Sequence, residues 1–287
     1  MKTSLTTDCS LLEALQTLVP GASNRTLRQM LAQGRVHLNG AICKLASTQA
    51  GAGDVVEIGG RGACSSRIHG LDIVFEDEHL LVIHKPAGLL TVATQHERER
   101  TAYAYLREYL QESPKKQKLF IVHRLDKFVS GLLVFAKSEA VKAGLQALFA
   151  KHHIQRRYWA IVEGRVENER GTIRSRIAQD RSMRMHSTED AEAGKHAVTH
   201  YRVLRCLPGL TCLEITLETG RKNQIRVHLS EMGHPIVGDQ AYGSTTDPLG
   251  RMGLHAFELG FAHPRLGTPM HFKTDPPPEF RRYLRTK

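Results

Sequence analysis

The stretch HRLDKFVSGLLVFA, residues 123–136, is the most informative pattern in the chain. It places one acidic residue, Asp126, between basic neighbours and ahead of the continuous apolar run 132–136. A short apolar run of this kind is typical of a strand whose two faces are both covered. Nearby cations favour the ionised form of a carboxylate. The stretch therefore predicts a negatively charged Asp126 at the entrance to a buried strand.

Other interpretations of this stretch compete. A salt-bridged turn needs nothing beyond the same charges. A protein-kinase catalytic loop needs Asp directly after His-Arg and a glycine-rich phosphate loop before it, but here Leu125 intervenes and no such loop precedes it. A hydrolase built on Ser130 and a nearby histidine lacks the Gly-x-Ser-x-Gly turn of the commonest α/β-hydrolases. From the residues alone, a structural turn and a catalytic acid both stay open.

The charge balance indicates a polyanionic partner. The 287 residues include 40 Lys and Arg against 29 Asp and Glu, a formal net charge of +11. Such an excess attracts polyanions, and nucleic acid and an anionic membrane surface are the two candidates. No apolar run approaches the roughly 20 residues of a spanning helix, and residues 1–8 lack the pattern of a signal peptide. We expect a cytoplasmic protein that binds nucleic acid and no membrane.

The cysteines do not have the spacing of a metal site. They are odd in number and scattered along the chain, at Cys9, Cys43, Cys64, Cys206 and Cys212. Metal-binding knuckles instead bring cysteines together in closely spaced pairs. We expect reduced, mostly buried thiols and no metal ion.

Residues 1–60 have the pattern of a small module. Residues 10–13 form a capping box that opens a helix, and a second helix follows it. Arg25 and Arg28 lie three positions apart on that second helix and therefore share a face. Residues 35–40 then alternate into an Asn-Gly turn, a strong hairpin signal. A basic helix followed by a hairpin favours an RNA-binding surface, and a merely solvated helix face is the alternative.

The rest of the chain predicts a larger α+β unit. Residues 61–70, rich in Gly, Ser and Arg, have the composition of a linker, and residues 71–287 form the second domain. Ser138 caps one helix there, while strands are expected at 73–75, 80–83, 132–136, 158–162 and 213–217. Strands outnumber helices and hairpins dominate, so the expected fold is a mixed, mostly antiparallel sheet.

A polar stretch interrupts this pattern between residues 178 and 195. It carries Arg181, Arg184 and Lys195. The stretch is too long for a passive turn, which predicts a functional loop that contacts RNA through these three side chains. Plain disorder is the alternative.

Six segments, in order, resemble the motifs of the RluA-type pseudouridine synthases. They are HRLD with SGLLV, and also HKPAG at 84–88, YWAIVEG at 158–164, TGRKNQIRVH at 219–228, GHPIVGD at 233–239 and LHA at 254–256. The resemblance covers about residues 70 to 275, and six ordered matches are far more specific than one. Residues 1–60 in turn resemble the S-four RNA-binding domain that many members of the family carry.

The resemblance implies an enzyme that isomerises uridine to pseudouridine in structured RNA without a cofactor. Asp126 would either attack the sugar or remove the proton next to the anomeric carbon, and the sequence does not choose between these routes. Arg226 would pair with Asp126, and Tyr158 would stack on the uracil. Arg124, with His123 beside it, would fill the space of the extruded base.

Three further residues are expected to support the site from behind: Arg221, Gln224 and His228. The favoured substrate is large-subunit ribosomal RNA, tRNA is the second choice, and the protein is expected to be a monomer. A non-catalytic RNA-binding or ribosome-assembly protein on the same scaffold is the alternative, and the intact Asp, Tyr and Arg set favours the enzyme.

The chain departs from the family pattern at two positions. Val129 stands where the family usually has Thr, so one hydroxyl is lost, which corresponds to about 1 kcal/mol if it made one hydrogen bond. Asn223 replaces the usual His. Neither change affects Asp126, Tyr158 or Arg226, so we expect an active enzyme.

Overall fold

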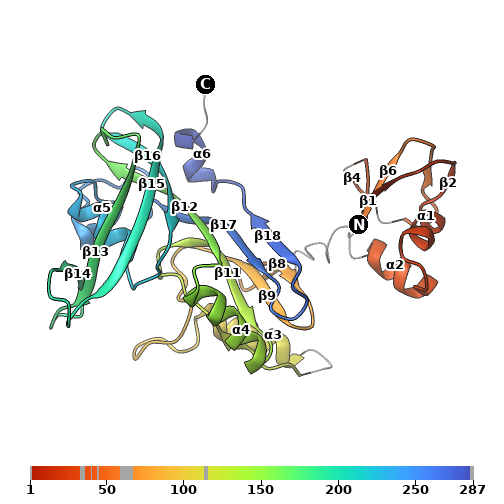
Figure 1. Ribbon diagram of the computed structural model, residues 1–287, viewed down its shortest axis with the longest axis horizontal. Coiled ribbons are helices and arrows are strands. Elements are labelled where there is room, and N and C mark those ends of the chain that lie inside the picture. Colours follow the sequence, from red (N-terminus) through yellow and green to blue (C-terminus); the bar gives the residue numbers. More distant parts are fainter. Residues whose placement is uncertain are drawn as a thin grey trace. The chain divides into compact units, whose positions relative to one another are not determined.

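The computed structural model of the chain describes residues 2–32, 36–39, 41–43, 45–58, 67–112 and 116–284. The chain divides into two compact units, residues 1–83 and 84–287. The division falls inside strand β9 (Leu80–Lys85), which also belongs to the large sheet. Figure 1 shows the small module up to residue 58 and the large sheet.

The small N-terminal module has its own apolar core. Helix α1 (Leu11–Leu18) begins at the predicted capping box, in which the Glu13 carboxylate accepts from the Ser10 N–H at 2.8 Å. Helix α2 (Asn24–Ala32) buries Leu27 and leaves Arg25 and Arg28 exposed. Two small sheets accompany the helices, with the strand orders β1 (Lys2–Ser4), β6 (Val55–Ile58), β3 (Val36–Leu38), β4 (Ala41–Ile42), and β2 (Cys9–Ser10), β5 (Gln49–Ala50).

The predicted hairpin is present in this module. Strands β3 and β4 pair antiparallel, and Asn39 between them has a φ of 53°. Asn tolerates this left-handed conformation better than most residues. The two ends of the predicted hairpin, Arg35 and Gly40, lie outside the described residues.

A sheet of twelve strands forms the rest of the chain. Its main path runs in the order β14 (Met185–Thr188), β13 (Arg170–Gln179), β15 (Lys195–Leu207), β16 (Leu210–Leu217), β12 (Gln155–Glu163), β17 (Leu254–Ala262), β11 (Ser130–Ala136), β9, β8 (Leu71–Glu76), β7 (Arg67–Ile68). Two further strands pair with this path, β10 (Phe120–Ile121) with β11 and β18 (Pro269–Lys273) with β17. Strands β11 and β17 run parallel, whereas every pair from β14 to β17 is antiparallel. The predicted fold class, α+β around a mixed and mostly antiparallel sheet, is confirmed.

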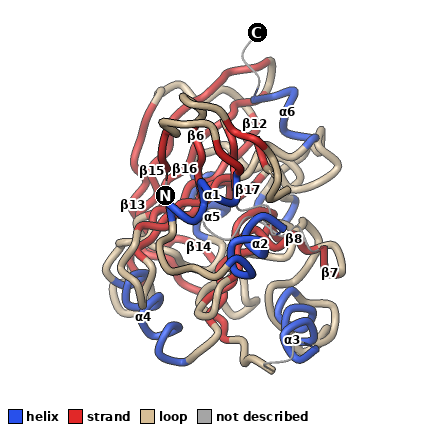
Figure 2. Tube along the Cα trace, turned by 90° about the vertical axis from the view of Figure 1, so that its right-hand side faces the viewer, coloured by secondary structure: helices blue, strands red, loops and turns tan. Residues whose placement is uncertain are grey.

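Helices cover this sheet at a few places. Helix α4 (Glu139–Ala150) starts at the predicted cap Ser138 and packs on β10 and β11. Helix α3 (Ala102–Glu112) lies at the same end of the sheet as α4, and α6 (Pro278–Leu284) lies at the other end (Figures 1 and 2). Helix α5 (Gln224–Glu231) packs on β14 and β15. A short 3₁₀ turn, η1 (Gln240–Tyr242), follows it.

Strand β11 is the centre of the core. All seven of its residues are buried, as predicted from its apolar run. Gly131 lets this strand approach β17, because a Cβ at Gly131 would lie 2.1 Å from the carbonyl oxygen of Ala256. The predicted alternation of 213–217 also holds, with Leu213, Ile215 and Leu217 buried.

The prediction of a functional loop at 178–195 is wrong. Strands β13 and β14 form a hairpin there, and β15 begins at Lys195. Asp180 closes the turn by accepting from the Arg184 N–H at 2.9 Å. The hairpin lies at the edge of the sheet, where polar side chains on both strands remain hydrated, so its composition resembles that of a loop.

Two smaller expectations also need correction. Within the predicted linker 61–70, residues 67 and 68 form β7, which pairs with β8, and residues 61–66 lie outside the described residues.

Among the described cysteines only Cys212 is buried, while Cys206 is exposed, so the expectation of mostly buried thiols was wrong. The four described cysteines are free.

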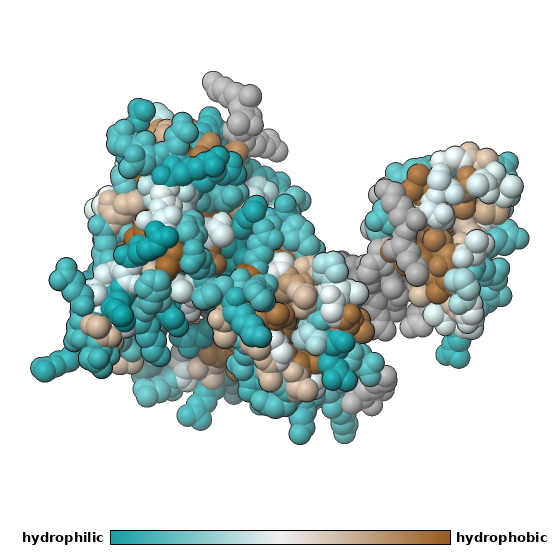
Figure 3. Space-filling model, viewed as in Figure 1, coloured by the Kyte–Doolittle hydropathy of each residue, from teal (hydrophilic) through white to brown (hydrophobic). Residues whose placement is uncertain are grey.

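The visible face of the large unit is mainly hydrophilic (Figure 3). Among the described residues, no helix combines the length and the apolarity that a membrane crossing requires. The described residues include no group of three or more His, Cys, Asp or Glu side chains placed to hold a metal ion.

Candidate active site

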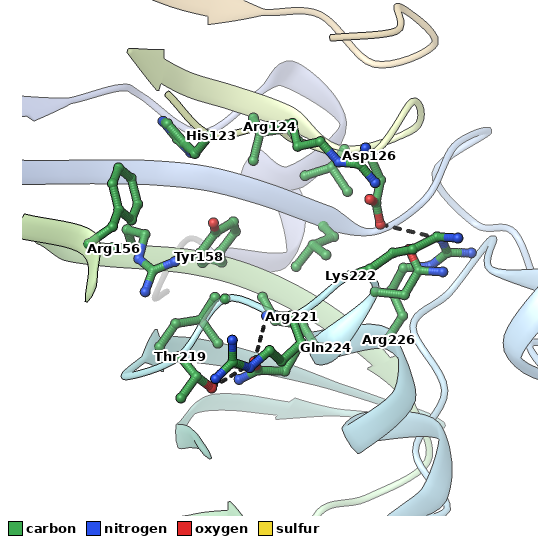
Figure 4. A pocket seen from close by; sticks show the side chains of 18 of the residues that line it. His123, Arg124, Asp126, Arg156, Tyr158, Thr219, Arg221, Lys222, Gln224 and Arg226 are labelled. Atoms are coloured by element: carbon green, nitrogen blue, oxygen red, sulfur yellow. Dashed lines mark hydrogen bonds and ion pairs between the residues drawn. The ribbon is translucent and has the colours of Figure 1, made fainter. Parts of the chain in front are cut away.

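A cleft of about 750 Å³ opens in the large unit beside Asp126. Four segments line it, namely 122–129, 149–158, 217–226 and Leu254. They bring together the loop before β11, the end of α4 with the start of β12, and the start of α5 (Figure 4). Together with Leu254 of β17, the cleft therefore joins residues of four of the six motifs quoted above.

The loop that carries Asp126 is fixed on both sides. Thr91 donates its hydroxyl to the Leu125 carbonyl at 2.6 Å and accepts from the Leu125 N–H at 3.1 Å. On the other side, the Lys127 carbonyl accepts from the Gly88 N–H at 2.8 Å and from Lys85 Nζ at 3.2 Å. Asp126 thus has a fixed backbone, while its side chain stays 29% exposed towards the cleft.

Lys85 is a fully buried cation that organises this loop. Its Nζ donates to the carbonyls of Pro86 and Leu89, at 2.9 and 2.7 Å, as well as to that of Lys127. Burial lowers the pKa of Lys85 to about 7, although the charge of Asp126 opposes this effect. Three backbone acceptors match the three protons of an ammonium group, so the geometry favours the charged form.

Arg226 on α5 reaches Asp126, but Asp239 holds it more tightly. The distance from Arg226 Nη1 to Asp126 Oδ2 is 3.4 Å. Its Nε and Nη2 donate to the two carboxylate oxygens of Asp239 at 2.7 and 2.8 Å, which is a bidentate pair. The guanidinium also lies over the Tyr242 ring at 4.6 Å. Burial acts to lower the pKa of Arg226, but Asp239 and Asp126 raise it overall.

Tyr158 on β12 and Phe149 on α4 are both aromatic side chains that line the cleft. Tyr158 is only 7% exposed and lines the cleft together with Asp126. Burial raises the pKa of its phenol, so the hydroxyl keeps its proton. The register of β12 against β17 shifts between Arg157 and Tyr158, and an irregularity of this kind commonly redirects a side chain next to an active site.

Comparison with known proteins agrees with this arrangement. Residues 79–231 match the family described as RNA pseudouridylate synthase. The chain belongs to the RNA pseudouridylate synthase family. The predicted activity, isomerisation of uridine to pseudouridine in RNA, is thereby confirmed at the level of the family.

Individual relatives span much of the chain. A ribosomal large subunit pseudouridine synthase D of Zymomonas mobilis is 39% identical over 226 residues, 74% of this chain and 71% of that protein. The protein of the same name from Pseudomonas aeruginosa is 35% identical over 92% of this chain and 87% of its own length. An uncharacterised RNA pseudouridine synthase of Bacillus subtilis is 40% identical over 68% of this chain, and the match spans 65% of that relative.

A solved structure has the same fold. The human RNA pseudouridylate synthase domain containing 4 superposes with a TM-score of 0.60 at 25% sequence identity. The superposition covers 74% of this chain and 92% of the human one.

Two predicted members of this pseudouridylate synthase site differ in exposure. Arg124 is exposed at the cleft and, among the described residues, has no ion-pair partner. His123 Nε2 instead accepts from the Val134 N–H at 3.2 Å, and its ring packs on Phe149 at 4.8 Å. Burial and the charge of Arg156 lower the pKa of His123 to about 3, so it is neutral. His123 also lines the cleft, and its contact with RNA stays a prediction.

The three residues predicted to support the site lie behind the cleft or at its rim. Gln224 is buried, accepts from Thr219 Oγ1 at 2.7 Å and donates to the Val198 carbonyl at 3.0 Å. His228 is fully buried between the hydroxyls of Thr199 and Ser175, each at 2.9 Å. Arg221 is exposed, and its Nε donates to the His196 carbonyl at 2.9 Å.

The basic residues of the segment 178–195, which was predicted to be a loop, do not line the cleft. Arg181 lies in the exposed turn of the β13–β14 hairpin, and Lys195 is exposed at the start of β15. Arg184 lies over the Tyr242 ring at 5.1 Å. The same ring supports Arg226, so Arg184 connects the hairpin to the neighbourhood of the site.

The two departures from the family pattern fit the structure. Val129 is buried, and its N–H donates to the Asp126 carbonyl at 3.1 Å, so the loop is closed without a hydroxyl. Asn223 has a φ of 54° and donates its amide to the Tyr242 hydroxyl at 3.0 Å. Asn is one of the residues that best tolerate this backbone conformation.

The structure contradicts the interpretation of Ser130 as a hydrolase nucleophile. Ser130 Oγ does lie 2.7 Å from His255 Nδ1, but the two residues are only 1% and 0% exposed. His255 Nε2 pairs with Thr274 Oγ1 at 2.9 Å, and Ser130 also accepts from Arg251. A substrate could not reach this buried network.

Sequence reasoning missed several residues that the structure places at the site. They are Lys85, Thr91, Arg156 and Asp239. Lys85 and Asp239 fall inside quoted motifs, so their signal was present but no role had been attached to it. Arg156 lies two positions before Tyr158 on a strand, and the period of two was the signal that could have placed both on the same face.

Proposed function

We propose that the chain converts uridine to pseudouridine in large-subunit ribosomal RNA, with Asp126 as the group that acts on the sugar. One observation supports this most. The Asp126 carboxylate is partly exposed in the cleft, next to Arg226, and the buried Tyr158 lines the same cleft. Relatives whose names state a ribosomal large-subunit function cover most of this chain, which favours that RNA over tRNA.

Each side chain has a defined task in this proposal. Asp126 attacks the sugar or removes a proton from it, and Arg226 orients the carboxylate. Tyr158 stacks on the uracil inside the cleft. The exposed Arg124 fills the place of the extruded nucleotide, because its flat guanidinium can stack between bases.

The N-terminal module serves as an RNA-binding domain of the S-four type in this proposal. Arg25 and Arg28 project from the exposed face of α2, while Leu27 anchors the helix in the core. Arg181, Arg184 and Lys195 add basic groups on the large unit. The net charge of +11 agrees with a polyanionic substrate. We also infer that the protein acts in the cytoplasm, as a monomer and away from membranes.

The test uses purified protein and unmodified transcripts of large-subunit rRNA and, separately, tRNA. Chemical tagging of pseudouridine should detect product on the rRNA with the native protein and none with Asp126→Asn, while RNA affinity is unchanged. Asp275→Asn, which alters an exposed carboxylate outside the cleft lining, should keep full activity. Product formed by Asp126→Asn would remove the catalytic assignment, and product on tRNA alone would overturn the choice of RNA.

A further inference from the structure

Arg156 is a buried cation without a counter-charge. It is 8% exposed, and no carboxylate of the described residues pairs with it. Its Nη2 donates to the backbone carbonyl of Glu218 at 3.2 Å, and its Nε has no hydrogen-bond partner among the residues that the structure describes. The Glu218 carboxylate is directed elsewhere, to His200 at 2.6 Å.

The surrounding residues hold this guanidinium in one place. It lies over the Phe149 ring at 5.1 Å. On another side, a Cβ added to Gly220 would come within 2.5 Å of Arg156 Nη1. Glycine at this position therefore leaves the space that the guanidinium occupies. A flexible surface arginine would not need such an accommodation.

The guanidinium belongs to the same cleft as Tyr158. Residues 156 and 158 are both buried and both line the cleft, as the alternation along β12 requires. Arg157 between them projects to the other side, where it pairs with Glu258 at 3.6 Å. Figure 4 shows the side chains of Arg156 and Tyr158 next to each other.

Such an arrangement is unfavourable for the empty protein. Burying a charge without a partner costs free energy, and a buried donor left unsatisfied needs an explanation. Desolvation accordingly lowers the pKa of the Arg156 guanidinium. The arrangement becomes favourable when a ligand brings acceptor oxygens into the cleft.

The depth of Arg156 identifies which part of an RNA can reach it. The cations suited to phosphates, Arg124, Arg221 and Lys222, are exposed at the cleft. Phosphates stay at the RNA surface, whereas an extruded base enters an enclosed pocket. A uracil ring presents carbonyl oxygens, and a guanidinium can donate to one of them.

We propose that Arg156 donates to a carbonyl oxygen of the target uracil and stabilises the negative charge that the ring acquires when it leaves the sugar. When the C1′–N1 bond breaks, its electron pair stays on the ring. The C1′–C5 bond then forms, C5 loses its proton and N1 gains one, so the reaction has no net change in composition. This inference rests on the proposed function and holds for either route of Asp126, because both expel the uracil as an anion.

The experiment compares Arg156→Met with Arg157→Met in the full chain. The RNA is an unmodified large-subunit rRNA transcript with tritium at C5 of uridine, and the enzyme is in excess, so tritium release reports the chemical step. We expect Arg156→Met to slow release at saturating enzyme by about 100-fold, the size of effect seen when a charge-stabilising donor is removed. RNA affinity and its salt dependence should stay within about twofold of native, and the melting temperature should not fall, because an uncompensated buried charge is removed.

The control variants make the result specific. Arg157→Met should release tritium within about threefold of the native rate, since that side chain lies outside the cleft. Arg156→Lys keeps the charge without the planar fork and should be slower than native but faster than Arg156→Met. If Arg156→Met does not fold, Arg156→Lys is used instead. A lower rate of tritium release at saturating enzyme, with an unchanged salt dependence of RNA affinity, then supports the inference.

Three outcomes would overturn the inference. Weaker RNA affinity with a salt slope lower by roughly 0.7–0.9 would mean that Arg156 binds a phosphate. A lower melting temperature with a rate loss equal to that of Arg157→Met would mean a structural role. An unchanged saturating rate would remove any role in the reaction. If the native protein itself releases no tritium from this transcript, the proposed function fails instead.

Discussion

At the scale of single residues, Arg226 contacts two carboxylates, and it binds one of them more closely than the other. Asp239 is 1% exposed and takes two of the nitrogen donors of Arg226, whereas Asp126 is 29% exposed and receives the third at 3.4 Å. Asp239 therefore fixes the guanidinium, and Asp126 remains accessible to a substrate. A carboxylate held from all sides would have no free oxygen for the sugar.

Asp239→Asn should separate these two tasks. The change keeps the shape of the side chain but removes the charge that orients Arg226, so we expect the single-turnover rate to fall about 10- to 100-fold. Breaking a buried ion pair should also lower the free energy of unfolding by about 3 kcal/mol. Rates measured well below the melting temperature, together with thermal melts, check both. A native rate in Asp239→Asn would show that Arg226 needs no anchor.

Strand β12 connects several parts of the site at the scale of elements. It carries Arg156 and Tyr158 near its start, and Glu163 at its end. The Glu163 carboxylate accepts from the backbone N–H groups of Thr245 and Thr246, at 2.8 and 2.7 Å, and from the Ser244 hydroxyl at 2.8 Å. This carboxylate therefore attaches the segment after Asp239 to the strand that carries Tyr158.

This attachment predicts a pH dependence of stability. Burial acts to raise the pKa of Glu163, but the hydrogen bonds of Thr246 and Ser244 lower it from the ordinary 4.5 to about 2. Because the pKa is lower in the folded state, the stabilisation is present above pH 4.5 and is lost as the pH falls towards 2. After allowance for solvent screening it amounts to about 1–2 kcal/mol. Melts of the native protein and Glu163→Gln should differ at pH 7 and converge only near pH 2, and a constant difference would contradict the assignment.

Two separately organised units make up the whole molecule. The N-terminal module has a core of its own around Leu11, Leu15, Leu27 and Leu31, and the cleft lies in the large unit. Substitutions in one core can therefore be made without touching the other. Under the proposed function, the module contributes affinity and the cleft contributes the rate.

Full-length protein with both Arg25→Gln and Arg28→Gln tests this division. We expect weaker binding of the rRNA transcript and a salt dependence less steep by roughly 1–2, because each arginine would neutralise one phosphate. The single-turnover rate at saturating enzyme should not change. Removal of residues 1–60 should weaken binding further. A salt slope equal to the native one would show that both arginines are only solvated surface.

Patterns among residues close together in the sequence were enough to predict many of the helices and strands of this protein. The caps at Ser10 and Ser138, the fully buried strand β11 and the alternation of 213–217 depend on neighbours within one element, whose periods of 3.6 and 2 are visible in the residues. The positions of Asp126, Tyr158 and Arg226 were predicted by the resemblance of six ordered motifs. The polar hairpin 178–188 was missed because an exposed edge strand and a loop share one composition.

Only the tertiary structure decided which of these groups meet. Asp126 and Arg226 are 100 residues apart in the chain, and nothing local fixes a contact across such a distance. The same holds for Lys85 beneath the Asp126 loop, for Asp239 behind Arg226, and for the absence of a carboxylate near Arg156 in the described structure. The sequence by itself determined the chemical groups and their local elements. The packing of the sheet determined their partners, because burial and counter-charge depend on segments that are distant along the chain.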